Sequence, residues 1–233
     1  MNVSIYHYDV LPSTNTVAKE KLSMGEGFGV ILADRQTAGR GRLGRSFFSE
    51  NGIFMSVMIP AASLHFSPML LTTAAAKAVC RAICAENFDA GIKWVNDIYV
   101  DGKKVSGILA EAVTENSVMR GFVVGIGVNV GAQDFPEELE SIAGTLVGDE
   151  GLRERVFHKI VENFVEVLTE TPAEIVAYCT EKSIVLGKEI RYFGAKEGFG
   201  TAIALDENGG LVVKQKNGEI ITLTGGEISV RLQ

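Results

Sequence analysis

Three arginines alternate with three glycines between Gly39 and Arg45. The charged side chains between Asp34 and Glu50 are all arginines, namely Arg35, Arg40, Arg42 and Arg45, although the net charge of the chain is -7. Guanidinium groups without a neighbouring acid repel one another, and they bind phosphate and carboxylate oxygens strongly. Glycine lets backbone N–H groups approach such an anion closely. The segment therefore predicts a loop that closes over a phosphate-bearing ligand.

Two known motifs match this loop only in part, and one structural alternative also applies to it. The spacing Gly39-x-Gly41-x-x-Gly44 matches a dinucleotide-binding fingerprint, but that motif leads directly into a helix, whereas residues 53–59 read as a strand. A glycine-rich loop between strands is also typical of protein kinases, and the sequence has neither the H-R-D-L nor the D-F-G signature. Taken alone, the loop is also compatible with a basic hairpin that faces solvent.

A second group of polar residues lies in Lys93-Trp94-Val95-Asn96-Asp97. We expect two strands, 92–100 and 105–112, joined by an Asp101-Gly102 turn, which is a strong hairpin signal. Lys104 would then lie at the mouth of the hairpin. Each feature also has an ordinary structural reading, because Lys104 fits an exposed charge, Trp94 a core residue and Asn96-Asp97 a turn cap.

Glycines interrupt an apolar strand in a third segment, Gly125 to Val130. Glycine inside a strand indicates close approach by a ligand or another backbone, and a core strand relieved by glycine is equally compatible.

Together these segments resemble the biotin protein ligase family, from about Tyr6 to Arg231. The family's motifs occur in order, with S-T-N at 13–15, A-D-R-Q-T-A at 33–38 leading into G-R-G-R-x-G-R, a segment similar to K-W-P-N-D at 93–97, K-x-x-G-I-L at 104–109 and G-I-G-x-N-V at 125–130. The segment G-E-I-S-V-R at 226–231 resembles the closing G-E-I-S-L-R of the family. Val95 replaces the usual proline of the third motif, and Phe47 replaces a tryptophan that usually follows the arginine loop. Neither change contradicts the activity that the resemblance implies.

The resemblance implies a two-step reaction. The carboxylate of biotin attacks the α-phosphate of ATP, which gives biotinyl-5′-AMP and pyrophosphate, and a lysine of a biotin carboxyl carrier protein or domain then attacks this mixed anhydride. Two anions must meet in the first step, so positive charge and positioning are the main requirements. Mg²⁺ is expected to accompany ATP with few protein ligands, and Asp97 is its expected ligand, directly or through water.

The resemblance also assigns site residues by matched motif position. It implies Lys104 and Arg42 as catalytic residues, with Lys104 between the carboxylate and the α-phosphate. The implied biotin contacts are Ser13, Thr14, Asn15, Gln36, Gly39, Arg40, Arg42, Lys104 and Gly107. The implied ATP or adenylate contacts are Arg40, Arg42, Arg45, Phe47, Lys93, Asn96, Asp97, Asn129 and Arg231.

The elements that would position these residues suggest an α+β protein. Helical patterns at 14–24, with Ser13 as N-cap, at 69–85 and at 152–168 alternate with strand-like runs, which predicts a mixed β-sheet backed by helices. After about residue 185, short strands and a type I′ hairpin signal at Lys216-Asn217-Gly218-Glu219 predict a small β-barrel that docks on the main domain. The resemblance implies a class II aminoacyl-tRNA synthetase-like, or biotin-lipoate ligase, fold for a catalytic domain 1–185 and an SH3-like barrel for 186–233.

Composition favours a cytoplasmic enzyme. The 233 residues, 46% hydrophobic, are enough for one sizeable core, and the sequence has neither an apolar run of membrane-spanning length nor a signal-peptide pattern. Cys80 and Cys84 lie one helical turn apart and, with Cys179, read as reduced core thiols, and these cysteines and three histidines are too few for a zinc site.

We expect no DNA partner. Only 12 residues precede Ser13, which is too short for the helix-turn-helix domain that some family members carry. The tail from Gly187 has six basic and six acidic side chains, so it offers no basic surplus for nucleic acid.

Two rival functions remain. One is a lipoate ligase or octanoyltransferase, and the other is a biotin-sensing regulator without catalysis. The arginine loop and the K-W-x-N-D block favour biotin, and Lys104 together with the arginines favours catalysis. A homodimer is compatible with the sequence.

Overall fold

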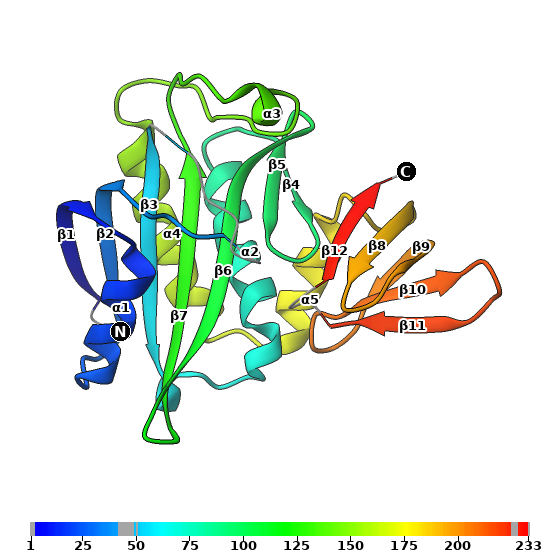
Figure 1. Cartoon of the computed structure of the whole chain (residues 1–233), viewed down its shortest axis with the longest axis horizontal. Helices are drawn as coiled ribbons and strands as arrows, with labels where there is room; N and C mark the ends of the chain where they lie inside the picture. Colours follow the sequence, from blue (N-terminus) through cyan, green and yellow to red (C-terminus); the bar gives the residue numbers. More distant parts are fainter. Residues whose placement is uncertain (1–2, 42–48, 50, 225–227, 233) are drawn as a thin grey trace.

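The computed structural model describes residues 3–41, 49, 51–224 and 228–232. Its strands form two sheets, a larger one within residues 4–129 and a smaller one in the C-terminal segment, which projects to one side of the main body (Figure 1). Within the described residues, no helix has both the length and the apolar composition needed to cross a membrane.

The larger sheet has seven strands in the order β1-β2-β3-β7-β6-β5-β4. Their bounds are β1 Ser4–Leu11, β2 Gly29–Gln36, β3 Gly52–Pro60, β4 Ala90–Lys93, β5 Asp97–Val100, β6 Lys103–Glu115 and β7 Val118–Asn129. β1 and β2 are parallel, since helix α1 (Thr14–Ser23) connects them, and the other neighbouring pairs are antiparallel. The predicted mixed sheet is confirmed.

Both faces of this sheet are covered, and this explains the long apolar run in β3. Met55 and Val57 pack into the core shared with helices α2 (Leu71–Cys84) and α4 (Leu152–Val167), whereas Met58 packs into a second cluster with Ala18 of α1. A strand buried on both faces reads as a continuous hydrophobic segment rather than an alternating one. In Figure 1, α1 lies in front of the sheet and α2 and α4 lie behind it.

The helices that follow α1 are mostly behind the sheet. Their bounds are α2 Leu71–Cys84, α3 Glu137–Glu140, α4 Leu152–Val167 and α5 Pro172–Glu181, with short 3-10 turns at Ala61–Ser63 and Pro68–Leu70. The predicted helices 14–24, 69–85 and 152–168 agree with α1, α2 and α4 within two residues at each end. Helix α5 was not predicted, although Thr171 and Glu174 form a capping box before and within its first turn.

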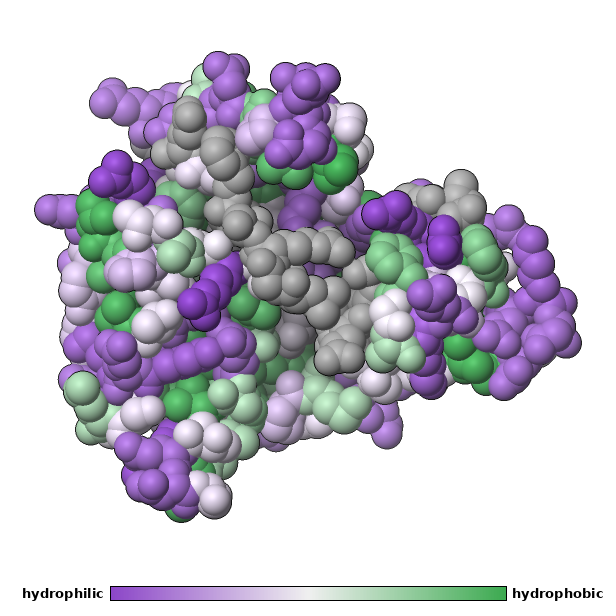
Figure 2. Space-filling model, in the orientation of Figure 1, coloured by the Kyte–Doolittle hydropathy of each residue, from purple (hydrophilic) through white to green (hydrophobic). Residues whose placement is uncertain are grey.

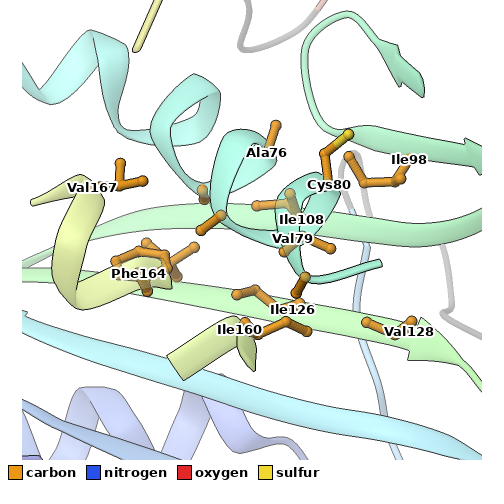
Figure 3. Packing of buried hydrophobic residues seen from close by; sticks show 14 of the residues in the cluster. Ala76, Val79, Cys80, Ile98, Ile108, Ile126, Val128, Ile160, Phe164 and Val167 are labelled. Atoms are coloured by element: carbon orange, nitrogen blue, oxygen red, sulfur yellow. The ribbon is translucent and has the colours of Figure 1, made fainter. Parts of the chain in front are cut away.

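The central packing places α2 and α4 against the sheet. In Figure 3, Val79 of α2 and Ile160 and Phe164 of α4 lie together with Ile108 and Ile126 of the sheet, and each is at most 3% exposed. Alanine occupies much of α2, so this helix can lie close to both the sheet and α4. Truncating a side chain such as Phe164 to alanine would cost about 3–5 kcal/mol of folding free energy.

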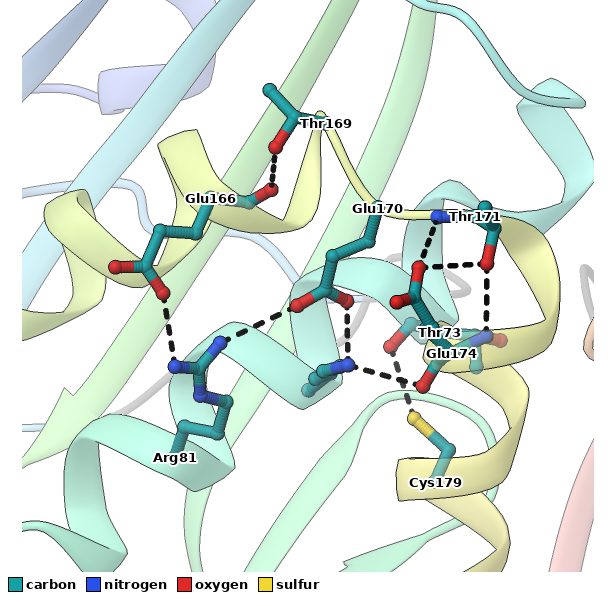
Figure 4. Close-up of polar contacts among 9 residues, drawn as sticks. Thr73, Arg81, Glu166, Thr169, Glu170, Thr171, Glu174 and Cys179 are labelled. Atoms are coloured by element: carbon teal, nitrogen blue, oxygen red, sulfur yellow. Dashed lines mark hydrogen bonds and ion pairs between the residues drawn. The ribbon is translucent and has the colours of Figure 1, made fainter.

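A charged network ties α2 to the connection between α4 and α5 (Figure 4). The Lys77 ammonium, in a residue only 6% exposed, lies 2.5 Å from Glu170 Oε2 and donates to the backbone oxygen of Glu174 at 3.0 Å. Arg81 lies 3.5 Å from the other oxygen of Glu170. Removing one partner of such a buried pair leaves a charge without compensation, which is strongly destabilising.

The C-terminal sheet has five antiparallel strands in the order β11-β10-β9-β8-β12. Their bounds are β8 Glu189–Gly194, β9 Gly198–Leu205, β10 Leu211–Gln215, β11 Ile220–Leu223 and β12 Ile228–Leu232. Among the described strands no pairing joins β11 to β12, so the sheet is open and the predicted barrel is not confirmed. Figure 2 shows this sheet as a separate lobe with hydrophilic residues at its far end.

The two predicted hairpin turns have different outcomes. Asp101 and Gly102 have φ values of 50° and 74°, which a type I′ turn requires at both central residues. The second turn has a positive φ at Gly218, 88°, but not at Asn217. The prediction of a type I′ turn there is wrong, because the loop is one residue longer and Gly218 takes the left-handed position that follows a type I turn.

The two sheets meet at the connection between β4 and β5. Trp94 and Val95 are buried in the hydrophobic cluster of the C-terminal sheet, and Ile92 of β4 forms a parallel bridge with Ser183. The C-terminal sheet therefore holds the K-W-V-N-D segment directly.

Candidate functional site

A cavity of about 1250 Å³ lies where the two sheets meet. Its walls come from the start of α1, the β4–β5 connection, β6, β7, the segment 139–143 and strands β8 and β12. The predicted site residues that line it are Ser13, Thr14, Asn15, Gln36, Arg40, Lys93, Asn96, Asp97, Lys104, Gly107, Asn129 and Arg231. Gly39 does not line the cavity, and Arg42, Arg45 and Phe47 lie outside the described residues.

The first turn of α1 and the end of β2 form a polar cluster, defined here as Ser13, Thr14 and Gln36. The backbone N–H of Thr14 donates to Gln36 Oε1 at 2.7 Å, and the Thr14 hydroxyl lies 3.2 Å from the same oxygen. Ser13 is the N-cap as predicted, but its side chain makes no capping hydrogen bond. Because Oε1 of Gln36 faces Thr14, the amide nitrogen of Gln36 is the atom left to donate toward the cavity.

The K-W-V-N-D segment is a turn between two strands, so the predicted continuous strand 92–100 is wrong. β4 ends at Lys93 and β5 begins at Asp97, and these two residues are paired across the hairpin. Asn96 Nδ2 donates to the backbone oxygen of Ile108 at 3.1 Å, which fixes the turn against β6. The tight reversal brings Lys93 and Asp97 to the same side of the cavity.

Lys104 lies beside Asp97 on the neighbouring strand. Its ammonium is 2.6 Å from Asp97 Oδ1, and the two side chains are 31% and 21% exposed. The Lys104 backbone is held on its other side, because its N–H donates to Ile142 and its carbonyl accepts from Gly144, both at 2.8 Å. The lysine is therefore fixed at the wall of the cavity.

Basic groups outnumber acids at this end of the cavity. Lys93, Lys104 and Arg231, with Asp97 between them, form a group that we call the cationic cluster. Burial lowers the pKa of Lys93, and the positive charges of Lys104 and Arg231 lower it further, whereas Asp97 acts in the opposite direction. Burial and Asp97 raise the pKa of Tyr99 to about 12, so its hydroxyl stays neutral beside Lys93. An anionic ligand would relieve the repulsion among the three cations.

Asn129 offers an acceptor to the cavity. It is 4% exposed, and its Nδ2 donates to the backbone oxygen of Gly144 at 2.9 Å. Its buried Oδ1 has no hydrogen-bond partner among the described residues. Buried acceptors are normally satisfied, so this oxygen is an unsatisfied position in the wall of the cavity.

Trp94 anchors the β4–β5 turn. Its indole N–H donates to the backbone oxygen of Gly209 at 2.9 Å, and the residue is 7% exposed. The motif tryptophan thus packs into the hydrophobic cluster of the C-terminal sheet and positions the turn residues on either side of it.

Three sets of residues escaped the sequence analysis. Ser56 and Glu111 contact α1 residues from the sheet, and the segment 139–143 forms a wall of the cavity. Ser56 gave one available signal, because it is the only polar residue inside the apolar run 53–59. The segment 139–143 gave none, because only its backbone pairing with Lys104 brings it to the site.

No group of three or more His, Cys, Asp or Glu side chains in the described part of the chain is arranged to hold a metal ion. Asp97 lines the cavity but already faces the Lys104 ammonium. The cysteines lie elsewhere, with Cys80 and Cys179 buried as predicted and Cys84 half-buried.

Comparison with known proteins gives two family matches. Residues 8–129 match the Biotin/lipoate A/B protein ligase family, and residues 185–231 match the Biotin protein ligase C terminal domain.

Individual relatives agree with these matches. The chain is 34% identical over 228 residues to the Bifunctional ligase/repressor BirA of Bacillus subtilis, which covers 92% of this chain and 70% of that protein. It is 27% identical to the Biotin--[acetyl-CoA-carboxylase] ligase of Mycobacterium tuberculosis, over 85% of this chain and 77% of that protein. Among solved structures, the biotin protein ligase from Aquifex aeolicus in complex with biotin and ATP superimposes with a TM-score of 0.84 at 28% identity, over 99% of both chains.

Proposed function

This chain belongs to the biotin/lipoate A/B protein ligase family, on its biotin protein ligase branch, and we propose that it activates biotin with ATP and transfers it to a carrier lysine. The acceptor is a lysine of a biotin carboxyl carrier protein or domain. The observation that carries this proposal is that one cavity joins the polar cluster to the cationic cluster. A ligand with a small polar ring and a distant carboxylate fits this distribution of groups.

The polar cluster binds the ureido ring of biotin. The Gln36 amide nitrogen donates to the ureido oxygen, and the Thr14 hydroxyl oxygen accepts from a ureido N–H. Ser13, which is 5% exposed, adds a hydroxyl beside them. A buried site built on such hydrogen bonds discriminates strongly against a ligand that lacks the matching groups.

The cationic cluster promotes adenylation. A carboxylate oxygen of biotin attacks the α-phosphorus of ATP, and the bond to the bridging oxygen breaks to release pyrophosphate. Lys104 lies between the two anions and stabilises the charge that develops on the phosphoryl oxygens, while Lys93 and Arg231 hold the phosphates. Asn129 Oδ1 accepts from the adenine amine, and Arg40 covers the adenylate.

The second step transfers biotin to the acceptor. The neutral amine of the carrier lysine attacks the carbonyl carbon of the mixed anhydride, AMP leaves with the bond electrons, and the nitrogen loses a proton to solvent. The enzyme must keep water from the anhydride until the acceptor arrives.

Mg²⁺ fits this site only together with ATP. Asp97 is the carboxylate of the cationic cluster and is paired with Lys104, so the residues that the structure describes offer no cage for the ion by themselves. Mg²⁺ is commonly bound through one or two carboxylates and substrate phosphates, and Asp97 would supply the protein ligand, directly or through water. Bound there, the ion would neutralise phosphate charge.

We propose that the chain divides into two domains at about residue 185. Residues 1–185 supply most of the substrate-binding groups, and residues 186–233 form an SH3-like unit whose five antiparallel strands resemble a barrel that has not closed. This unit contributes Phe193 and Arg231 to the cavity and holds Trp94.

Calorimetric titration and a pyrophosphate assay together test the function. We expect biotin to bind to the protein, lipoate to bind much more weakly, and pyrophosphate to appear only with biotin and ATP together. Preferential lipoate binding would indicate a lipoate ligase, and biotin binding without pyrophosphate release would indicate a sensor. A purified carrier domain then provides the transfer assay, read as biotin on its lysine.

A further inference from the structure

A chain of polar contacts runs from β6 through α1 to the polar cluster. Glu111 of β6 accepts from Asn15 Nδ2 at 2.7 Å, and its other carboxylate oxygen lies 2.6 Å from Lys19 Nζ. On the far side of Asn15, Ser56 Oγ lies 2.6 Å from Asn15 Oδ1 and 2.7 Å from Thr14 Oγ1. Five side chains from α1, β3 and β6 are therefore linked in one path.

The middle of this path is tightly held. Ser56 is fully buried and lies in a strand that is otherwise apolar. Asn15 lies against Gly125 of β7, where an added Cβ would be 2.3 Å from Asn15 Oδ1. Asn15 lines the cavity, whereas Ser56 and Glu111 do not. The contacts that connect Glu111 to the polar cluster therefore run through Asn15 and Ser56.

The chemistry of Glu111 fixes the direction of every hydrogen bond along the path. A carboxylate paired with an ammonium can only accept, so Asn15 must turn its NH₂ group toward Glu111 and its carbonyl oxygen toward Ser56. That oxygen requires the Ser56 hydroxyl hydrogen. Ser56 has only one hydrogen to give, so its short contact with Thr14 requires the Thr14 hydroxyl to donate.

These hydrogen-bond directions leave one acceptor and one donor in the polar cluster. With its hydrogen used on Ser56, the Thr14 oxygen is left as an acceptor, and Gln36 Oε1 is satisfied by the Thr14 backbone N–H at 2.7 Å. The Gln36 amide nitrogen then remains as the donor. An acceptor beside a donor is the complement of a cyclic urea, which presents an N–H next to a carbonyl oxygen.

We propose that Glu111 is a positioning residue that sets the donor and acceptor pattern of the biotin pocket through Asn15, Ser56 and Thr14. The inference rests on the proposed function for the identity of the ligand. It also changes the role of Asn15, because both polar ends of its amide are already used by the protein, and it acts by orienting Ser56 rather than by binding biotin itself.

Glu111→Gln is an isosteric change that reverses the pattern. Lys19, which stays beside position 111, attracts the new amide oxygen, so the new NH₂ group faces Asn15. Asn15 must then flip, its NH₂ group points at Ser56, and the hydroxyl directions toward Thr14 are reversed. Adding Lys19→Met removes this bias, and the glutamine can then turn its oxygen back to Asn15 and restore the original direction.

The test compares biotin dissociation constants by calorimetry for the wild type, Lys19→Met, Glu111→Gln and the double variant. We expect Glu111→Gln to weaken biotin binding about tenfold or more, which corresponds to ~1.4 kcal/mol. Lys19→Met alone should change the biotin dissociation constant less than about fivefold, because an ion pair whose side chains are about one-third exposed contributes little. The double variant should recover to within about fivefold of the wild type.

Two controls separate this mechanism from general damage. Glu115 lies on the same strand as Glu111 and forms an exposed ion pair with Arg120 of β7, so Glu115→Gln should leave biotin affinity unchanged. Ser56→Ala interrupts the path at its middle. The double variant Ser56→Ala with Glu111→Gln should therefore bind biotin no more weakly than whichever of the two single variants binds it less tightly. Ser56→Ala also tests the path if Glu111→Gln does not fold, as judged by thermal unfolding.

The outcomes are decisive in both directions. Recovery in the double variant supports the proposal, because a purely structural role of Glu111 predicts additional damage when Lys19 is also lost. Wild-type affinity in Glu111→Gln, or a double variant as weak as the single one, overturns it. Failure of the wild-type protein to bind biotin would refute the proposed function instead.

Discussion

Replacing Lys104 with alanine tests the central electrostatic element of the site. The Lys104 ammonium lies 2.6 Å from Asp97. In the proposed mechanism, it stands between the biotin carboxylate and the α-phosphate. A unit charge about 4 Å from another contributes ~4 kcal/mol at an effective dielectric constant of about 20. This agrees with the ~2.7–4 kcal/mol, or ~10²–10³ in rate, that follows from removing one group that stabilises a transition-state anion. We therefore expect biotin-dependent pyrophosphate release to fall ~10²–10³-fold.

The same change should have little effect on folding. Both partners of the Lys104–Asp97 pair are more than one-fifth exposed, and pairs of this kind contribute no more than about 1 kcal/mol. For a chain of this length, that corresponds to a Tm change of about 2–4 °C. Pyrophosphate release at saturating biotin and ATP measures the first effect, and thermal unfolding measures the second.

A second variant makes the reasoning sharper. Lys104→Arg keeps a positive charge beside Asp97, so it should retain more of the rate than Lys104→Ala. Undiminished pyrophosphate release in Lys104→Ala would show that Lys104 does not neutralise the reacting anions. A Tm loss far above a few degrees would mean that the variant fails by unfolding and that the pair is structural.

Three further predictions concern other parts of the site and the fold. The Arg40→Gly variant should release biotinyl-5′-AMP, because Arg40 lines the cavity and, in the proposed mechanism, helps to retain the anhydride. The release is measured as biotin attached to an unrelated bystander protein, and labelling no greater than with the wild type would contradict the prediction. Trp94→Phe keeps a buried aromatic ring but loses the hydrogen bond to Gly209. We expect KM for ATP to rise several-fold with little change in the biotin dissociation constant. If KM for ATP and the biotin dissociation constant rise equally, Trp94 does not act only by anchoring the β4–β5 turn. Glu170→Ala should lower the free energy of unfolding, measured by chemical denaturation, by about 3–5 kcal/mol, because Lys77 would remain buried without its partner. The double variant Lys77→Met with Glu170→Ala removes both charges, so it should lose less free energy of unfolding than Glu170→Ala alone.

Local chemistry explains which parts of the fold the sequence predicted. Asp101-Gly102 can adopt two successive positive φ values at low cost, so the turn it forms was predictable from two residues. The periodic helices α2 and α4 were equally predictable from their apolar faces. Asn217-Gly218 offered the same local signal and gave a different turn, because loop length and strand register decide the turn type together.

The K-W-V-N-D segment could not be placed from its residues alone. Its flanking residues Ile92 and Ile98 have the spacing of one continuous strand, yet they face each other across the β4–β5 hairpin. What favours the reversal is the burial of Trp94 and Val95 in a sheet that lies about 100 residues later in the chain, with an indole hydrogen bond to Gly209. Contacts so distant in sequence leave no trace in a local pattern.

The sequence by itself indicated the family of the protein and the candidate residues of its site. Charge repulsion among arginines and lysines, and glycines where a backbone must approach a ligand, are properties of residue type and spacing, and these motifs already carried the resemblance to the biotin protein ligase family. The tertiary structure decided which of these groups meet and in which direction they donate. Lys104 meets Asp97 only because β5 and β6 pair, and the Thr14 hydroxyl is oriented by Ser56 and Glu111 only because α1 packs on β3 and β6. Hydrogen-bond direction depends on every partner in the chain at once, so it is fixed only when strands and helices far apart in sequence are brought into contact.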